Sequence, residues 1–129
     1  ILSLEPLEAL RNIPYANKKT KVITDINPII PFTLNKNREK FPNLIDIFKE
    51  IQNNAILYKI DALAIAKNSG STISKNFVLL GALSAIDILP FDSKILLDII
   101  LDNTYPLYED INKKAFLGGM KIMKNIRDG

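Results

Sequence analysis

The 129-residue sequence contains no cysteine and no histidine. The chain therefore has no thiolate nucleophile, no imidazole base and no disulfide framework. It also lacks the side chains that ordinary zinc and iron–sulfur sites use as ligands. If the function involves metal chemistry, we expect the metal to be held by a partner.

The excess of one sign of charge is also small: 17 basic and 14 acidic residues leave a net charge of +3. The basic residues are spread along the chain in no run longer than two, which is typical of a solvated surface and gives a nucleic-acid partner little support. No apolar run reaches the roughly 18 residues of a membrane span, and no charged leader precedes a short apolar segment. We expect no membrane association and a cytoplasmic location.

Hydrophobic residues make up 47% of the sequence, enough for the core of one domain. The longest run that is both apolar and free of internal breakers lies within residues 71–90, STISKNFVLLGALSAIDILP. Oxygen-bearing side chains at its start and Pro90 at its end predict a helix, and its apolar residues fall on every face. Gly81 lowers helix propensity by about 1 kcal/mol against Ala, so we expect another backbone to approach closely there.

Strand and helix patterns alternate in the first half of the chain, and helix patterns alone fill the second. The fold class expected is α/β, a layered fold with a small mixed sheet flanked by helices and a helical C-terminal half. Strands are expected at residues 1–4, 21–26 and 55–60, an extended edge segment at 28–31, a loop at 35–42, and helices at 5–11, 43–52, 62–67, 94–101 and from 108 onward. We expect residues 1–129 to form a single domain whose N-terminal part is missing, because Ile1 opens in the middle of a strand pattern.

Four residues are candidates for contact with a cofactor or ligand, and each has a simpler structural interpretation. Glu5 lies at a helix start, where an acid interacts favourably with the helix dipole. Arg11 suits a carboxylate or phosphate, but equally an ion pair with Glu8. Asp61 follows a strand, where ligands of α/β sheets gather, although a helix N-cap is the commoner role. Asn76 is expected to be a buried amide that needs partners, with capping of a neighbouring loop as the simpler interpretation. None is assigned as catalytic.

Three segments together resemble one protein family. They are LEPLEALR at residues 4–11, DA followed by Ala66 and NFVLLGAL at residues 61–83, and NKKAF with Gly119 at residues 112–119. They resemble, in order and spacing, segments of the beta subunits of indolepyruvate ferredoxin oxidoreductases, which carry the gamma-type domain of the 2-oxoacid:ferredoxin oxidoreductases. Shorter landmarks fit as well: PIIP at 28–31, FP at 41–42 and LP at 89–90. The resemblance covers nearly the whole chain but not the family's N-terminal strand and glycine-rich turn.

The resemblance implies a subunit that is inactive alone and takes part in the coenzyme A-dependent oxidative decarboxylation of arylpyruvates. In that family thiamine diphosphate and the iron–sulfur clusters belong to the partner alpha subunit, coenzyme A is a co-substrate, and electrons pass to ferredoxin. No cofactor is then expected on this chain alone, in agreement with its lack of cysteine. The alternative is a non-catalytic α/β protein-interaction module. A neighbouring gene rich in ferredoxin-type cysteine spacings would favour the enzyme.

Overall fold

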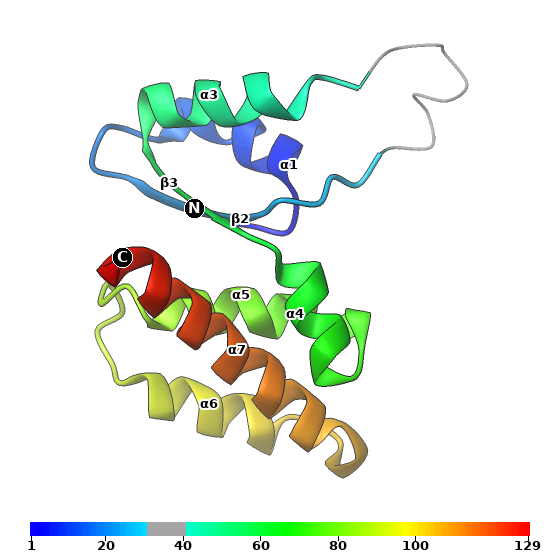
Figure 1. The fold of residues 1–129 in the computed structure, drawn as a ribbon. Coiled ribbons are helices and arrows are strands. Elements are labelled where there is room, and N and C mark those ends of the chain that lie inside the picture. Colours follow the sequence, from blue (N-terminus) through cyan, green and yellow to red (C-terminus); the bar gives the residue numbers. More distant parts are fainter. Residues whose placement is uncertain (31–40) are drawn as a thin grey trace.

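Three parallel strands form the centre of the molecule: β1 (Leu2–Ser3), β2 (Lys21–Asp25) and β3 (Ile56–Ile60), in the order β1-β2-β3. They are seen in a computed structural model that describes residues 1–30 and 41–129 (Figure 1). The α/β class is confirmed, and the described strands are all parallel. Their carboxyl ends therefore lie at one edge of the sheet.

Helices cover both faces of this sheet (Figure 1). Val22 packs with residues of α1 (Pro6–Arg11) and α3 (Leu44–Asn54), whereas the next residue, Ile23, packs into a second cluster of buried residues on the opposite face of the sheet. Both side chains are fully buried, as the two-residue period of a strand between two helical layers requires. The second layer comprises α4 (Ala62–Ser69), α5 (Lys75–Ser84) and α7 (Glu109–Asp128), with α6 (Ser93–Asp102) on its outer side. Short 3₁₀ turns occur at Ile13–Tyr15, Thr72–Ser74 and Pro106–Tyr108.

The predicted helix at residues 71–90 is shorter than its pattern suggested. A 3₁₀ turn (Thr72–Ser74) leads into α5, which ends at Ser84. Ser84 Oγ donates a hydrogen bond to Gly81 O (2.7 Å), and Asp87 has a positive φ of 54°. The positive φ of Asp87 is incompatible with a right-handed helix, so the chain leaves the helix in a turn before it reaches Pro90. Arg127 of α7 holds this turn by pairing with Asp87 (2.7 Å).

The expected burial of this helix and the close approach at Gly81 are both confirmed. No residue from Phe77 to Ile86 is exposed. A Cβ added to Gly81 would lie 1.9 Å from the carbonyl oxygen of Phe116, and one added to Gly119 would lie 1.8 Å from that of Val78. Helices α5 and α7 therefore touch backbone to backbone, which only glycine permits at these two positions.

The remaining predicted elements agree with the structure within one or two residues at most ends. At the expected edge segment, residues 28–30 form no strand, and Pro31 lies outside the described residues, as does most of the expected loop at 35–42. In the part of the chain that the structure describes, no helix is long and apolar enough to cross a membrane.

Candidate functional site

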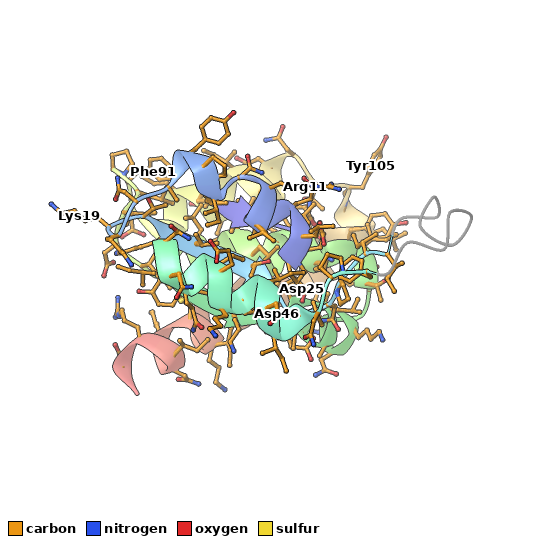
Figure 2. The ribbon with its side chains drawn as sticks, turned by 90° about the horizontal axis from the view of Figure 1, so that it is seen from above. Arg11, Lys19, Asp25, Asp46, Phe91 and Tyr105 are labelled. Carbon is orange, nitrogen blue, oxygen red and sulfur yellow. The ribbon has the colours of Figure 1, made fainter. Side chains whose placement is uncertain are left out.

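The carboxyl edge of the sheet gathers polar side chains from several elements around Asp25, the last residue of β2. Asp25 is fully buried. Its Oδ1 accepts hydrogen bonds from Asn27 Nδ2 (3.0 Å) and from the backbone N–H of Ala62, the first residue of α4 (3.0 Å). Figure 2 shows Asp25 within the body of the molecule, beneath the α1 and α3 layer. A buried carboxylate needs such partners, because removing it from water without them is costly.

The second oxygen of Asp25 faces Lys75 in the first turn of α5. Lys75 Nζ lies 3.1 Å from Asp25 Oδ2, and the lysine side chain is 16% exposed. Oδ2 accepts no hydrogen bond from the described residues, so this contact is an ion pair. The same ammonium donates a hydrogen bond to the carbonyl oxygen of Leu4 (2.8 Å). Lys75 thus links α5 to the ends of β1 and β2.

Asp61 lies at the end of β3 and joins the same cluster through Asn27. Its Oδ1 accepts from the backbone N–H of Ala64 (3.0 Å) and from Asn27 Nδ2 (2.9 Å). The helix N-cap interpretation of Asp61 is therefore confirmed. Asn27 bridges two carboxylates on neighbouring strands, and Asp61 remains exposed at the rim.

Glu5 and Arg11 use their charged groups within α1. Glu5 is buried and caps α1, accepting from the backbone N–H groups of Leu7 (3.0 Å) and Glu8 (2.6 Å). Arg11, at the other end of the helix, forms an exposed ion pair with Glu8. The structural interpretation of each residue holds, and within the described residues neither charged group bonds to Asp25 or to the residues that contact it.

The expectation that Asn76 is a buried amide is wrong, because its side chain is exposed. It lies in the first turn of α5, beside β1, which is an edge strand of the described sheet. With Leu2, Leu4 and Leu80 it lines a shallow cavity of about 200 Å³. Its amide makes no hydrogen bond to the described residues.

Sequence reasoning missed Asp25, Asn27 and Lys75, which together with Asp61 form the cluster at the carboxyl edge. One signal was present: Asp25 is a charged residue inside a β-branched strand pattern, at the end of the strand where α/β folds place their ligands. Lys75 gave no signal, because its partner lies 50 positions earlier. Within residues 1–30 and 41–129, no group of three or more acidic side chains is arranged to hold a metal ion.

Similarity to known proteins extends over most of the chain. Residues 1–122 match the family described as pyruvate ferredoxin/flavodoxin oxidoreductase. The chain is 34% identical over 128 residues to a protein of Pyrococcus horikoshii named indolepyruvate oxidoreductase subunit IorB, covering 98% of this chain and 63% of the relative. A protein of the same name from Methanothermobacter thermautotrophicus is 32% identical over 120 residues, covering 92% of this chain and 61% of the relative. The chain thus spans less than two thirds of the length of these relatives.

A solved structure has the same fold. It is described as the crystal structure of the keto/oxoacid ferredoxin oxidoreductase gamma subunit from Geobacter sulfurreducens PCA. The two structures align with a TM-score of 0.68 at 16% sequence identity, over 96% of this chain and 64% of that chain. At this identity the likeness concerns the fold.

Proposed function

Because this chain belongs to the pyruvate ferredoxin/flavodoxin oxidoreductase family, we propose that it acts as a subunit of a 2-oxoacid:ferredoxin oxidoreductase, the indolepyruvate enzyme in particular. One observation carries the choice of branch: the relatives from Pyrococcus horikoshii and Methanothermobacter thermautotrophicus share the name indolepyruvate oxidoreductase subunit IorB. Their identity to this chain extends over 92–98% of its length.

The reaction proposed is the oxidative decarboxylation of an arylpyruvate. The bond between the carboxylate and the keto carbon breaks, carbon dioxide leaves, the acyl group passes to the sulfur of coenzyme A, and two electrons pass to ferredoxin. Thiamine diphosphate supplies the electron sink that this cleavage needs. We assign the iron–sulfur clusters to a partner alpha subunit, because these 129 residues contain no cysteine to hold a cluster. Thiamine diphosphate is assigned to the same subunit from the family resemblance.

The contribution of this chain is then binding and support, with no catalytic residue assigned. Of the four candidates, Glu5 and Arg11 are already engaged within α1. Asp61 uses only its Oδ1 in the contacts with Ala64 and Asn27. Its Oδ2 and the amide of Asn76 remain for contact with a cofactor, substrate or partner, because both residues are exposed at or near the carboxyl edge of the sheet. The ion pair of Asp25 with Lys75 connects the end of β2 to α5 and so stabilises that edge. We further propose that the described chain functions as one domain of the gamma type.

Co-expression tests this proposal. The chain is produced together with a tagged thiamine-binding, cluster-bearing subunit encoded in the same genome, and the tagged subunit is purified at low salt. We expect the two to co-purify in a fixed ratio, with an unrelated tagged protein as the control. Failure to co-purify would favour the alternative, an interaction module without an enzymatic partner.

A further inference from the structure

A cavity of about 350 Å³ lies where the start of α5, the end of α6 and the start of α7 meet. Cavities that bind small molecules have volumes of about 300–1,000 Å³, so this one suits a ligand of one or two rings. None of the described residues that line it carries a charge. Since burying a charge without a partner is costly, the part of a ligand that enters the cavity is expected to be neutral.

Three polar side chains on one side of the cavity, Ser74, Thr104 and Asn112, are joined by hydrogen bonds and are called the polar wall below. Ser74 Oγ donates to Asn112 Oδ1 (2.9 Å), and Asn112 Nδ2 donates to Thr104 Oγ1 (3.3 Å). Thr104 Oγ1 in turn donates to the carbonyl oxygen of Ile100 (2.7 Å). Ser74 is only 3% exposed and Asn112 only 7%, so the polar wall is a fixed part of the fold.

The hydrogen bonds of the polar wall determine what it can offer to a ligand. A hydroxyl group has one hydrogen and two lone pairs, and Ser74 and Thr104 each donate their hydrogen to a neighbouring group. Among the described residues, Ser74 Oγ accepts no hydrogen bond from a side chain in the cavity, and Thr104 Oγ1 accepts only one. Both oxygens therefore have acceptor capacity left, which a ligand satisfies by donating an N–H or an O–H.

The other sides of the cavity are aromatic and aliphatic. Phe77 is half-buried and Tyr108 is 50% exposed. Ile73 (86%) and Tyr105 (81%), which also line the cavity, are among the most exposed large apolar side chains of the described residues. Figure 2 shows Tyr105 projecting from the body of the molecule. A planar ligand would cover these side chains and pack against their rings, offset or edge to face.

We propose that this cavity binds a neutral, planar aromatic molecule that carries a hydrogen-bond donor, the chemical class of indole and phenol. The ring packs among Phe77, Tyr105 and Tyr108, and its N–H or O–H donates to Ser74 Oγ or Thr104 Oγ1. A few placed polar groups in an otherwise apolar cavity are the usual composition of a small-molecule site. This site goes beyond the proposed function and does not depend on it, because every residue of the site belongs to this chain.

The test is a titration of the isotope-labelled chain with indole and with benzofuran, followed by NMR. Benzofuran has nearly the same shape as indole but carries an oxygen in place of the N–H. Indole should shift the signals of the residues that line the cavity. It should also bind about two- to tenfold more tightly than benzofuran, because one hydrogen bond to the polar wall is lost with the N–H.

Two variants and a matched control locate the binding. Tyr105→Ala should weaken the binding of both ligands about two- to tenfold, because it removes one ring of the cavity. Tyr15→Ala is the control, since Tyr15 is 86% exposed and lies in the turn after α1, away from the cavity; it should bind as the unmodified chain does. The double variant Ser74→Ala with Thr104→Val removes both hydroxyl groups and should bind indole no more tightly than benzofuran. Melting temperatures report whether each variant is folded.

Three results would each overturn the proposal: no shifts at the residues that line the cavity, equal affinity of the unmodified chain for indole and benzofuran, or equal losses with Tyr105→Ala and Tyr15→Ala. The first two need no variant, so the proposal is decided even if the double variant does not fold. None of these results bears on the proposed function, which co-purification tests separately.

Discussion

Gly81 of α5 lies directly against the carbonyl oxygen of Phe116 in α7, so close that an added Cβ would be 1.9 Å from it. Gly119 of α7 stands in the same relation to Val78 of α5, at 1.8 Å. The second helical layer is thus built on a reciprocal contact between two backbones. The obstacle at both positions is main chain, which cannot move aside as a side chain can.

Replacing Gly81 should therefore destabilise the protein although it improves helix propensity. Gly81→Ala gains about 1 kcal/mol of propensity, whereas overpacking costs about 1–3 kcal/mol or more, and here the two helices must separate. Gly81→Leu should be worse still. Urea unfolding measures the change in the free energy of unfolding. Gly118→Ala is the comparison within α7, because its Cβ would meet the side chain of Ile65 at 2.7 Å and no backbone atom of another element. A Gly81→Ala variant as stable as the original would show that the helices do not touch there.

The buried pair of Asp25 and Lys75 gives a second prediction. Lys75→Met leaves the fully buried carboxylate of Asp25 without its cation, and breaking such a pair costs about 3–5 kcal/mol. Asp25→Leu combined with Lys75→Met should cost less than the sum of the two single changes. A double-mutant cycle by urea unfolding measures this coupling. Additive losses would mean that the two groups do not stabilise each other.

Glu5 and Arg11 should differ in their effect on stability. Glu5→Ala removes both hydrogen bonds that cap α1 and should lower the free energy of unfolding by about 0.5–2 kcal/mol. Arg11→Ala removes only an exposed ion pair and should change it by less than about 1 kcal/mol. Thermal unfolding of the two variants compares them. The assignment of Glu5 as a cap would be wrong if Arg11→Ala were the more damaging change.

Local signals predicted much of the fold. The N-cap at Asp61, the strand at residues 21–26 and the helix at residues 43–52 each depend on a few consecutive residues, so local sequence is enough to predict them. Gly81 could be predicted to lie at a close helix contact, because a glycine inside a helix lowers helix propensity and is favoured where another backbone approaches. The sequence could not say that Phe116 is the partner.

What sequence failed to predict depends on contacts between distant residues. Asn76 was expected to be buried because its neighbours are apolar, yet it faces the open side of the edge strand β1. The ion pair of Lys75 with Asp25 joins two elements whose relative position only the folded chain defines. The end of α5 at Ser84, before Pro90, likewise depends on the turn at Asp87 and its pairing with Arg127.

The most direct test of the account is the reduction of ferredoxin by the reconstituted pair of subunits. The purified chain is mixed with the proposed thiamine-binding subunit, coenzyme A and oxidised ferredoxin, and the rate of ferredoxin reduction is followed on addition of indolepyruvate and, separately, of pyruvate. The account predicts reduction with indolepyruvate that requires both subunits and coenzyme A. Equal rates with and without this chain would contradict it.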